Sequence, residues 1–198
     1  MTPRSIPELA AAALEVLSAL DEGGILACVI GALAVHRWGE PRATSDADFS
    51  ALATYGAEQP VVDALLSRFE ARRPDAAAFA LANRVLLLRT HEGVAVDVAL
   101  AAFSFEIEAL DMASSWEVLP GVGLRTCPAE HLVVYKLVAG RTHDLSDMES
   151  IVRRQGRRLD VDRIRRWGRE FAELKEDPDL LRPFEEALRK ARASTPRT

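Results

Sequence analysis

Residues 25–52, with the sequence ILACVIGALAVHRWGEPRATSDADFSAL, contain the pattern that decides the fold. The apolar run at residues 25–30 predicts a short strand, and Gly31 interrupts it. Residues 32–38 predict a short helix, and residues 45–52 alternate between polar and apolar side chains as a strand does. A strand, a glycine break, a helix and a second strand in this order indicate a mixed α/β fold.

Two carboxylates share one face of the second predicted strand. Asp46 and Asp48 project from that face about 6 to 7 Å apart, because each strand residue rises about 3.3 Å. Carboxylates at this separation repel one another unless a cation lies between them. Hard oxygen ligands of this kind suit Mg²⁺, which binds through one or two carboxylates together with substrate phosphates.

A third acid, Asp97, stands in the apolar run of residues 94–100, which also predicts a strand. A buried acid without a partner costs several kcal/mol, so we expect Asp97 to lie beside Asp46 and Asp48 on a neighbouring strand. Three carboxylates placed in this way would hold two Mg²⁺ ions about 3.5 to 4 Å apart, the arrangement that serves in-line phosphoryl displacement.

Each of these residues also fits a purely structural interpretation. Asp46 fits a turn or cap position after Thr44 and Ser45, and Asp97 fits an exposed edge position. Gly31 either lets phosphate oxygens approach the backbone N–H groups at the start of the helix, or simply makes a tight turn.

The rest of the chain divides near Thr126, where the composition changes. We predict a mixed core at residues 1–125 and a helical region at residues 126–198. In the core, helices are expected at residues 8–20, 61–72 and 103–112, and strands at residues 84–90, 94–100 and 116–124, the last as a strand pair. In the helical region, breaks are expected at Gly140, at Gly156 and near Pro178.

The composition is that of an ordinary globular protein. The 198 residues are 48% apolar and 28% charged, with a net charge of −5. No apolar run is long enough to cross a bilayer and the first residues lack a signal-peptide core, so we expect a cytoplasmic protein. Cys28 and Cys127 are far apart and are expected to be reduced structural thiols.

The sign of the charge reverses locally in residues 153–169, which carry eight arginines against Asp160 and Asp162. This Arg-rich stretch fits an anionic partner such as tRNA or other RNA. Such a run is more often the solvated face of a surface helix.

The order and spacing of these motifs resemble those of the nucleotidyltransferase superfamily of the DNA polymerase β type. In that pattern a glycine turn, here Gly31-Ala32, is followed by D-x-D, here Asp46-Ala47-Asp48, and by a later acid, here Asp97. The sequence is most similar to the AbiEii/AbiGii toxin-like branch, in its PRATSDADF stretch at residues 41–49 and in its K-x4-R-x2-D-x2-D motif. That motif has Lys136, Arg141, Asp144 and Asp147.

The resemblance covers roughly residues 25–150 and implies a nucleotidyltransferase-like mixed sheet core with flanking helices and a helical C-terminal part. It implies an activity that moves a nucleoside monophosphate from an NTP to a hydroxyl acceptor, with Asp46, Asp48 and Asp97 as catalytic and Mg²⁺-binding residues. It also implies nucleotide binding by a larger set of residues: Gly31, Ala32, Arg42, Ser45, Lys136, Arg141 and Asp144. Ala32 departs from the pattern, because many active members have Ser or Gly there.

Two further hypotheses therefore stay open beside the enzyme. The first is a catalytically degenerate protein that keeps the fold and binds nucleotide or a partner protein without turnover. The second is a toxin–antitoxin component that is held in check by a partner protein from a neighbouring gene.

Overall fold

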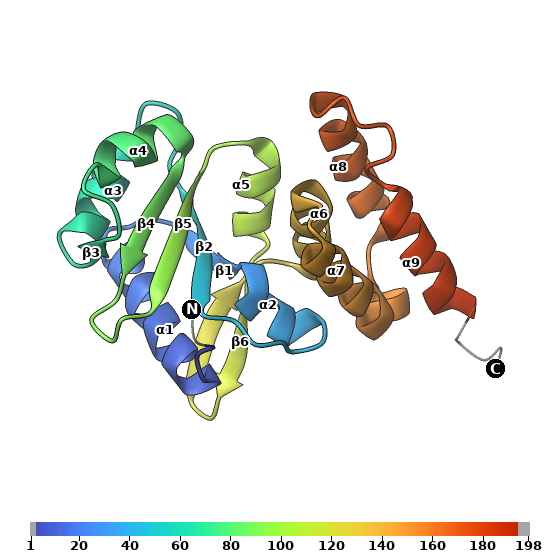
Figure 1. Cartoon of the computed structure of the whole chain (residues 1–198), viewed down its shortest axis with the longest axis horizontal. Helices are drawn as coiled ribbons and strands as arrows, with labels where there is room; N and C mark the ends of the chain where they lie inside the picture. Colours follow the sequence, from blue (N-terminus) through green and yellow to red (C-terminus); the bar gives the residue numbers. More distant parts are fainter. Residues whose placement is uncertain (1–2, 194–198) are drawn as a thin grey trace. The chain divides into compact units, whose positions relative to one another are not determined.

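A mixed sheet forms the centre of the first of two units in this computed structural model, which describes residues 3–193 (Figure 1). The first unit comprises residues 1–34 and 42–127, and the second comprises residues 35–41 and 128–198. The strands of the sheet are β1 (Ala27–Ile30), β2 (Asp46–Leu52), β3 (Glu70–Ala71), β4 (Val85–Arg89), β5 (Ala95–Ala101), β6 (Ser114–Leu119) and β7 (Val122–Thr126).

The strand order is β3-β4-β5-β2-β1-β7-β6. Strands β2 and β5 are parallel, as are β1 and β7, and the remaining neighbours are antiparallel. The predicted mixed α/β class is confirmed.

The β2–β5 register buries one face of these two strands. Ala47 pairs with Val96, Phe49 with Val98 and Ala51 with Leu100, and all six side chains are buried. Because side chains alternate along a strand, Asp46, Asp48 and Asp97 project from the opposite face. Burial of one apolar face therefore fixes the register and with it the position of the acids.

Helices of the first unit flank this sheet. They are α1 (Ile6–Glu22), the start of α2 (Gly31–Trp38), α3 (Glu58–Leu66), α4 (Ala76–Asn83) and α5 (Ser104–Asp111). The Ser5 hydroxyl accepts a hydrogen bond from the Glu8 backbone, and the Glu8 carboxylate accepts one from the Ser5 backbone, so a capping box starts α1. Helix α1 contacts β1, β2 and β7.

The second unit is helical in the residues that the structure describes. It contains α6 (Ala129–Ala139), α7 (Thr142–Gln155), the 3₁₀ turn η1 (Gly156–Arg158), α8 (Val161–Leu174) and α9 (Arg182–Ala193). Helix α6 packs against α7 and α8, and α7 packs against α9. The predicted breaks at Gly140, at Gly156 and near Pro178 all fall between these helices.

One predicted helix is wrong in its second half. The helix expected at residues 61–72 ends at Leu66, and Glu70 and Ala71 form β3 instead. Pairing of Glu70 with Arg89 and of Ala71 with Leu88 adds these residues to the edge of the sheet, and this pairing outweighs the amphipathic pattern. Helix α4 was not predicted.

Within residues 3–193, none of the helices is both long and apolar enough to cross a membrane.

Candidate active site

The sheet register brings the three predicted acids together. Asp48 pairs with Asp97 across the parallel β2–β5 ladder, and Asp46 stands two residues before Asp48 on the same face. Parallel neighbouring strands lie about 4.8 Å apart, so the backbones of Asp48 and Asp97 are immediate neighbours. The predicted placement of Asp97 on a strand beside the D-x-D pair is confirmed.

Asp48 lies directly against Gly31, the residue that begins α2. Ile30, the last residue of β1, pairs with Asp48, so the chain turns into α2 over the carboxylate. A Cβ atom on Gly31 would lie 1.9 Å from Oδ2 of Asp48, and Gly31 has a φ of +61°. Only glycine meets both demands without strain. The carboxylate therefore stands at the positive N-terminal end of a helix, where backbone N–H groups face anions.

Asp46 is held by the segment that precedes β2. The Thr44 hydroxyl donates a 2.6 Å hydrogen bond to Oδ1 of Asp46. The Thr44 carbonyl in turn accepts a hydrogen bond from the backbone of Arg4, which ties this segment to the start of the chain. These bonds orient the Asp46 carboxylate before any ligand arrives.

Asp97 carries an ion pair with Arg72, a residue that sequence reasoning missed. The Arg72 backbone N–H donates to the Leu87 carbonyl, and Leu87 pairs with Asp97, so Arg72 lies two strands away in the same row. From there its Nη2 donates to Oδ1 of Asp97. The expected helix at residues 61–72 hid this contact, because a helical Arg72 would have had no fixed relation to β5.

Burial, opposed by Arg72 and reinforced by the nearby Asp46 carboxylate, raises the pKa of Asp97. Burial thus disfavours the charged form of the Asp97 carboxylate, and the Arg72 guanidinium partly compensates its charge. The Nε of Arg72 is buried and has no hydrogen-bond partner among the described residues.

The donor set fits Mg²⁺ in its chemistry, because it consists of carboxylate oxygens on a rigid sheet. Within residues 3–193, however, no three His, Cys, Asp or Glu side chains converge closely enough to hold a metal ion. The Asp97 carboxylate instead accepts a hydrogen bond from Arg72, which follows β3 directly. Asp46 and Asp48 are the residues that would hold a cation, and Asp97 would join them when it leaves Arg72.

The other predicted nucleotide-binding residues of the first unit all precede the D-x-D pair in sequence. Ala32 is buried in α2 immediately after Gly31 and offers only its backbone to a phosphate. Arg42 is half-buried and donates to the Ala43 carbonyl at 3.3 Å. Ser45 is half-buried immediately before β2.

Lys136, Arg141 and Asp144 belong to the second unit, where they form a cluster of their own. The buried Lys136 ammonium lies 3.0 Å from Oδ1 of Asp144 and 2.8 Å from Oδ2 of Asp147. Nε of Arg141 donates to Oδ2 of Asp144 at 2.6 Å. The cluster joins the end of α6 to the first turns of α7, so the motif has a structural role in the helical unit.

Burial alone would raise the pKa of Asp144, but hydrogen bonds from Arg141 and Lys136 outweigh it and lower the pKa below its ordinary value of 3.8. A lowered carboxyl pKa means that this pairing stabilises the fold above that ordinary value. The stabilisation is lost as the pH falls through the lowered pKa.

We predict that Gly31→Ala destabilises the protein more than Gly56→Ala. Both glycines have a positive φ, but a Cβ on Gly56 would meet nothing within 4 Å. The backbone strain of about 1 to 2 kcal/mol is therefore common to both variants, and the clash with Asp48 is not. Denaturant unfolding measures the difference, which should shrink when Gly31→Ala is combined with Asp48→Ala. It should not vanish, because the Cβ of residue 48 would still lie 2.7 Å from the Cβ of residue 31. Equal costs for the two single variants would contradict the contact.

We predict that Lys136→Met lowers the free energy of unfolding by about 3 to 5 kcal/mol at neutral pH, because it leaves Asp144 and Asp147 buried without their cation. Lys190→Met is the matched control. Lys190 contacts Glu149 at 3.4 Å in an exposed pair, which contributes less than about 1 kcal/mol. Chemical denaturation at pH 7 and again below pH 4 is the measurement, and the gap between the variants should shrink in acid. A Lys136→Met variant as stable as Lys190→Met would refute the structural role.

Comparison with known proteins identifies the fold. No protein-family model and no curated protein matches this sequence. Among solved structures, an antigenic nucleotidyltransferase-like protein from Paracoccidioides brasiliensis matches with a TM-score of 0.54 and 16% identity, over 95% of this chain and 95% of that chain.

The antibiotic-resistance factor ANT(2'')-Ia matches in two structures. Its solution structure gives a TM-score of 0.55 and 13% identity over 87% of this chain and 95% of that one. Its complex with adenylyl-2''-tobramycin gives a TM-score of 0.52 and 14% identity over 84% and 98%. At these identities the likeness concerns the fold alone, and the fold of this chain is nucleotidyltransferase-like.

Proposed function

We propose that this protein is a Mg²⁺-dependent nucleotidyltransferase, which moves a nucleoside monophosphate from an NTP to a hydroxyl acceptor. The observation that carries the proposal is the alignment of Asp46, Asp48 and Asp97 on one face of β2 and β5, with the start of α2 held open over Asp48 by Gly31. The nucleotidyltransferase-like fold supports it.

The three carboxylates would have different roles in the reaction. Asp46 and Asp48 would hold Mg²⁺, with a second ion shared with Asp97. When bound, the ions supply positive charge against the phosphates and the charge that develops during transfer. Asp97 would accept the proton of the acceptor hydroxyl. The hydroxyl oxygen forms a bond to the α-phosphorus while the bond from that phosphorus to the bridging oxygen breaks, and pyrophosphate leaves with the electron pair.

Phosphate binding would fall to the start of α2 and to the segment that enters β2. The backbone N–H groups of Gly31 and Ala32 would face the phosphates, since Ala32 has no hydroxyl to offer. Arg42 and Ser45 precede the D-x-D pair by a few residues and would add polar contacts. A nucleotide role for Lys136, Arg141 and Asp144 remains a prediction, because the Lys136 ammonium already contacts two buried carboxylates.

A small hydroxyl compound is the acceptor that the observations favour. One fold neighbour was solved with adenylyl-2''-tobramycin, a small molecule that carries an adenylyl group. The Arg-rich stretch at residues 153–169 offers RNA fewer unengaged guanidinium groups than its sequence indicates, because several of its arginines contact groups of the protein itself. These are Arg153, Arg154, Arg163, Arg165 and Arg166.

RNA as acceptor, a partner protein from a neighbouring gene and the AbiEii/AbiGii toxin-like branch therefore stay predictions. Neutralising Arg157, Arg158, Arg165 and Arg166 together is the variant that would test RNA binding, through the salt dependence of the affinity.

A second candidate function is nucleotide binding without turnover. The Arg72–Asp97 ion pair favours it, because a permanent pair would keep the third carboxylate from a metal ion. Ala32 favours it as well, because one hydroxyl contact to phosphate is missing. This candidate predicts affinity for Mg²⁺-NTP without release of pyrophosphate.

We predict that the protein releases pyrophosphate from at least one of the four NTPs in the presence of Mg²⁺ and a mixture of small hydroxyl compounds and cellular RNA. Asp48→Asn should reduce the rate roughly 100-fold or more, because it removes a ligand of the ions that stabilise the transferring group. A coupled assay for pyrophosphate, with α-labelled NTP to mark the acceptor, measures both quantities.

Asp111→Asn serves as the matched control, because Asp111 is exposed at the end of α5 and changes the charge equally. Pyrophosphate release that persists in Asp48→Asn would contradict the proposed site. Binding of Mg²⁺-NTP by calorimetry without release from any NTP would support the second candidate instead.

A further inference from the structure

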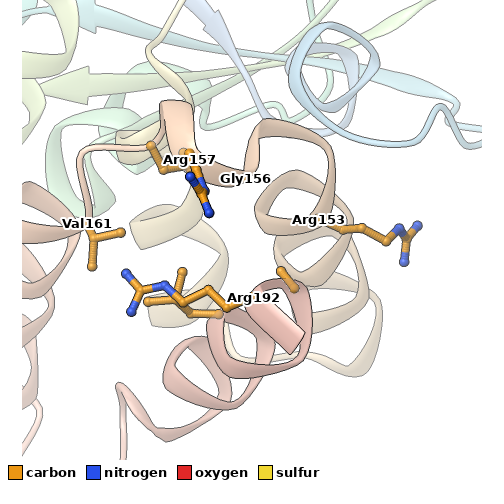
Figure 2. A pocket seen from close by; sticks show the side chains of 8 residues that line it. Arg153, Gly156, Arg157, Val161 and Arg192 are labelled. Atoms are coloured by element: carbon orange, nitrogen blue, oxygen red, sulfur yellow. The ribbon is translucent and has the colours of Figure 1, made fainter. Parts of the chain in front are cut away.

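A pocket of about 390 Å³ lies within the second unit (Figure 2). Its walls come from the end of α7, the η1 turn, the start of α8 and the end of α9. Pockets that bind small molecules have volumes of about 300 to 1,000 Å³, so this one has room for a compact ligand. It uses none of the residues that were assigned to the nucleotidyltransferase site.

The charged groups of the pocket are all positive. Its lining residues include Arg153, Arg157 and Arg192 and no Asp or Glu. Arg153 points away from the pocket in Figure 2 and pairs with Glu40. Arg157 and Arg192 instead extend across the opening, and neither forms a hydrogen bond or an ion pair within residues 3–193 (Figure 2).

This lack of partners distinguishes the two residues from Arg165 of the same unit. Arg165 is held by Glu185 through hydrogen bonds of 2.7 and 2.9 Å. The pKa of Glu185 is lowered mainly by its hydrogen bonds from Arg165 and to a smaller extent by the charge of Arg192. Both carboxylate oxygens of Glu185 are therefore already bound to Arg165. The guanidinium groups of Arg157 and Arg192 thus keep their donors for a ligand.

Gly156 sets the position of Arg157. It ends α7 with φ of 54° and ψ of −119°, a combination that residues with a Cβ avoid. A Cβ there would meet nothing within 4 Å, so the backbone angle, not crowding, requires glycine. The turn stops Arg157 from continuing α7 and brings it to the rim of the pocket.

The rest of the lining is apolar. Leu159 and Leu188 are 7% and 4% exposed, and Val161 and Ala191 complete the surface between them. A bare inorganic anion would leave this surface uncovered. A ligand that covers it carries an apolar or planar body beside its charge.

We propose that this pocket binds a small phosphate monoester with an apolar or planar body. A phosphate monoester carries a charge of about −1.5 to −2 at neutral pH, which matches two guanidinium groups, whereas a carboxylate matches one. Guanidinium groups bind phosphate oxygens through paired N–H donors. The body of the ligand lies on the apolar floor made by Leu159, Val161 and Leu188.

A small molecule fits these observations better than RNA does. Arg158, the next residue along the chain, is exposed but does not line the pocket. A phosphodiester chain tracking the surface would use Arg158 as readily as Arg157, because its attraction is to charge in general. A pocket ligand would use Arg157 and Arg192 alone.

Phenyl phosphate is the test probe, because it joins a dianion to a planar apolar ring. We expect it to shift the backbone amide signals of residues 153–161 and 188–192 in ¹H–¹⁵N spectra of the full chain. EDTA and the Asp48→Asn background exclude the carboxylate site. Arg157→Gln and Arg192→Gln should each weaken the affinity roughly tenfold or more, and the double variant should abolish the shifts.

Arg158→Gln is the matched control and should bind phenyl phosphate as the wild type does. Phenol, which lacks the anion, should cause no shifts, and inorganic phosphate should bind more weakly than phenyl phosphate. The proposal is overturned if the double variant still binds, or if no shifts appear in these segments. It is also overturned if a single-stranded RNA binds this face and Arg158→Gln weakens it as much as Arg157→Gln.

Discussion

Repulsion among three carboxylates on two adjacent strands is the constraint on which the rest of the site depends. The register that buries Phe49 and Val98 on one face forces Asp46, Asp48 and Asp97 onto the other. The fold answers this repulsion with a helix N-terminus over Asp48, a hydroxyl donor on Asp46 and a guanidinium on Asp97. Each of these contacts comes from a different element, and together they leave a half-buried anionic site.

Buried carboxylates of the helical unit are also compensated by donors of the protein itself. Its buried acids, Asp144 and Asp147, share the ammonium of Lys136, which ties α6 to α7. Most arginines near the surface of this unit also bind groups of their own chain. Arg157 and Arg192 have no hydrogen bond or ion pair within residues 3–193, and both line one pocket (Figure 2). Their charge therefore lies beside an apolar floor.

Much of the site could be predicted from the sequence, because period-two alternation fixes which face a strand residue occupies. That alternation placed Asp46 and Asp48 together, and the cost of an isolated acid placed Asp97 beside them. Arg72 could not be found in this way. Its segment has the spacing of an amphipathic helix, and only the pairing of β3 with β4 brings the side chain into the row of Asp97. The Lys136 motif was predicted as phosphate-binding, and its ion pairs within the helical unit depend on tertiary packing that no local pattern reveals.

We propose that the carboxylates of β2 and β5 form a divalent cation site for which Arg72 is the resident counter-ion. The most direct measurement is anomalous scattering from crystals grown with Mn²⁺ and a non-hydrolysable NTP. We predict Mn²⁺ bonded to carboxylate oxygens of Asp46 and Asp48, with the triphosphate at the start of α2 and Arg72 released from Asp97. Mn²⁺ bound only elsewhere, with the Arg72–Asp97 pair intact and no nucleotide at α2, would contradict the claim.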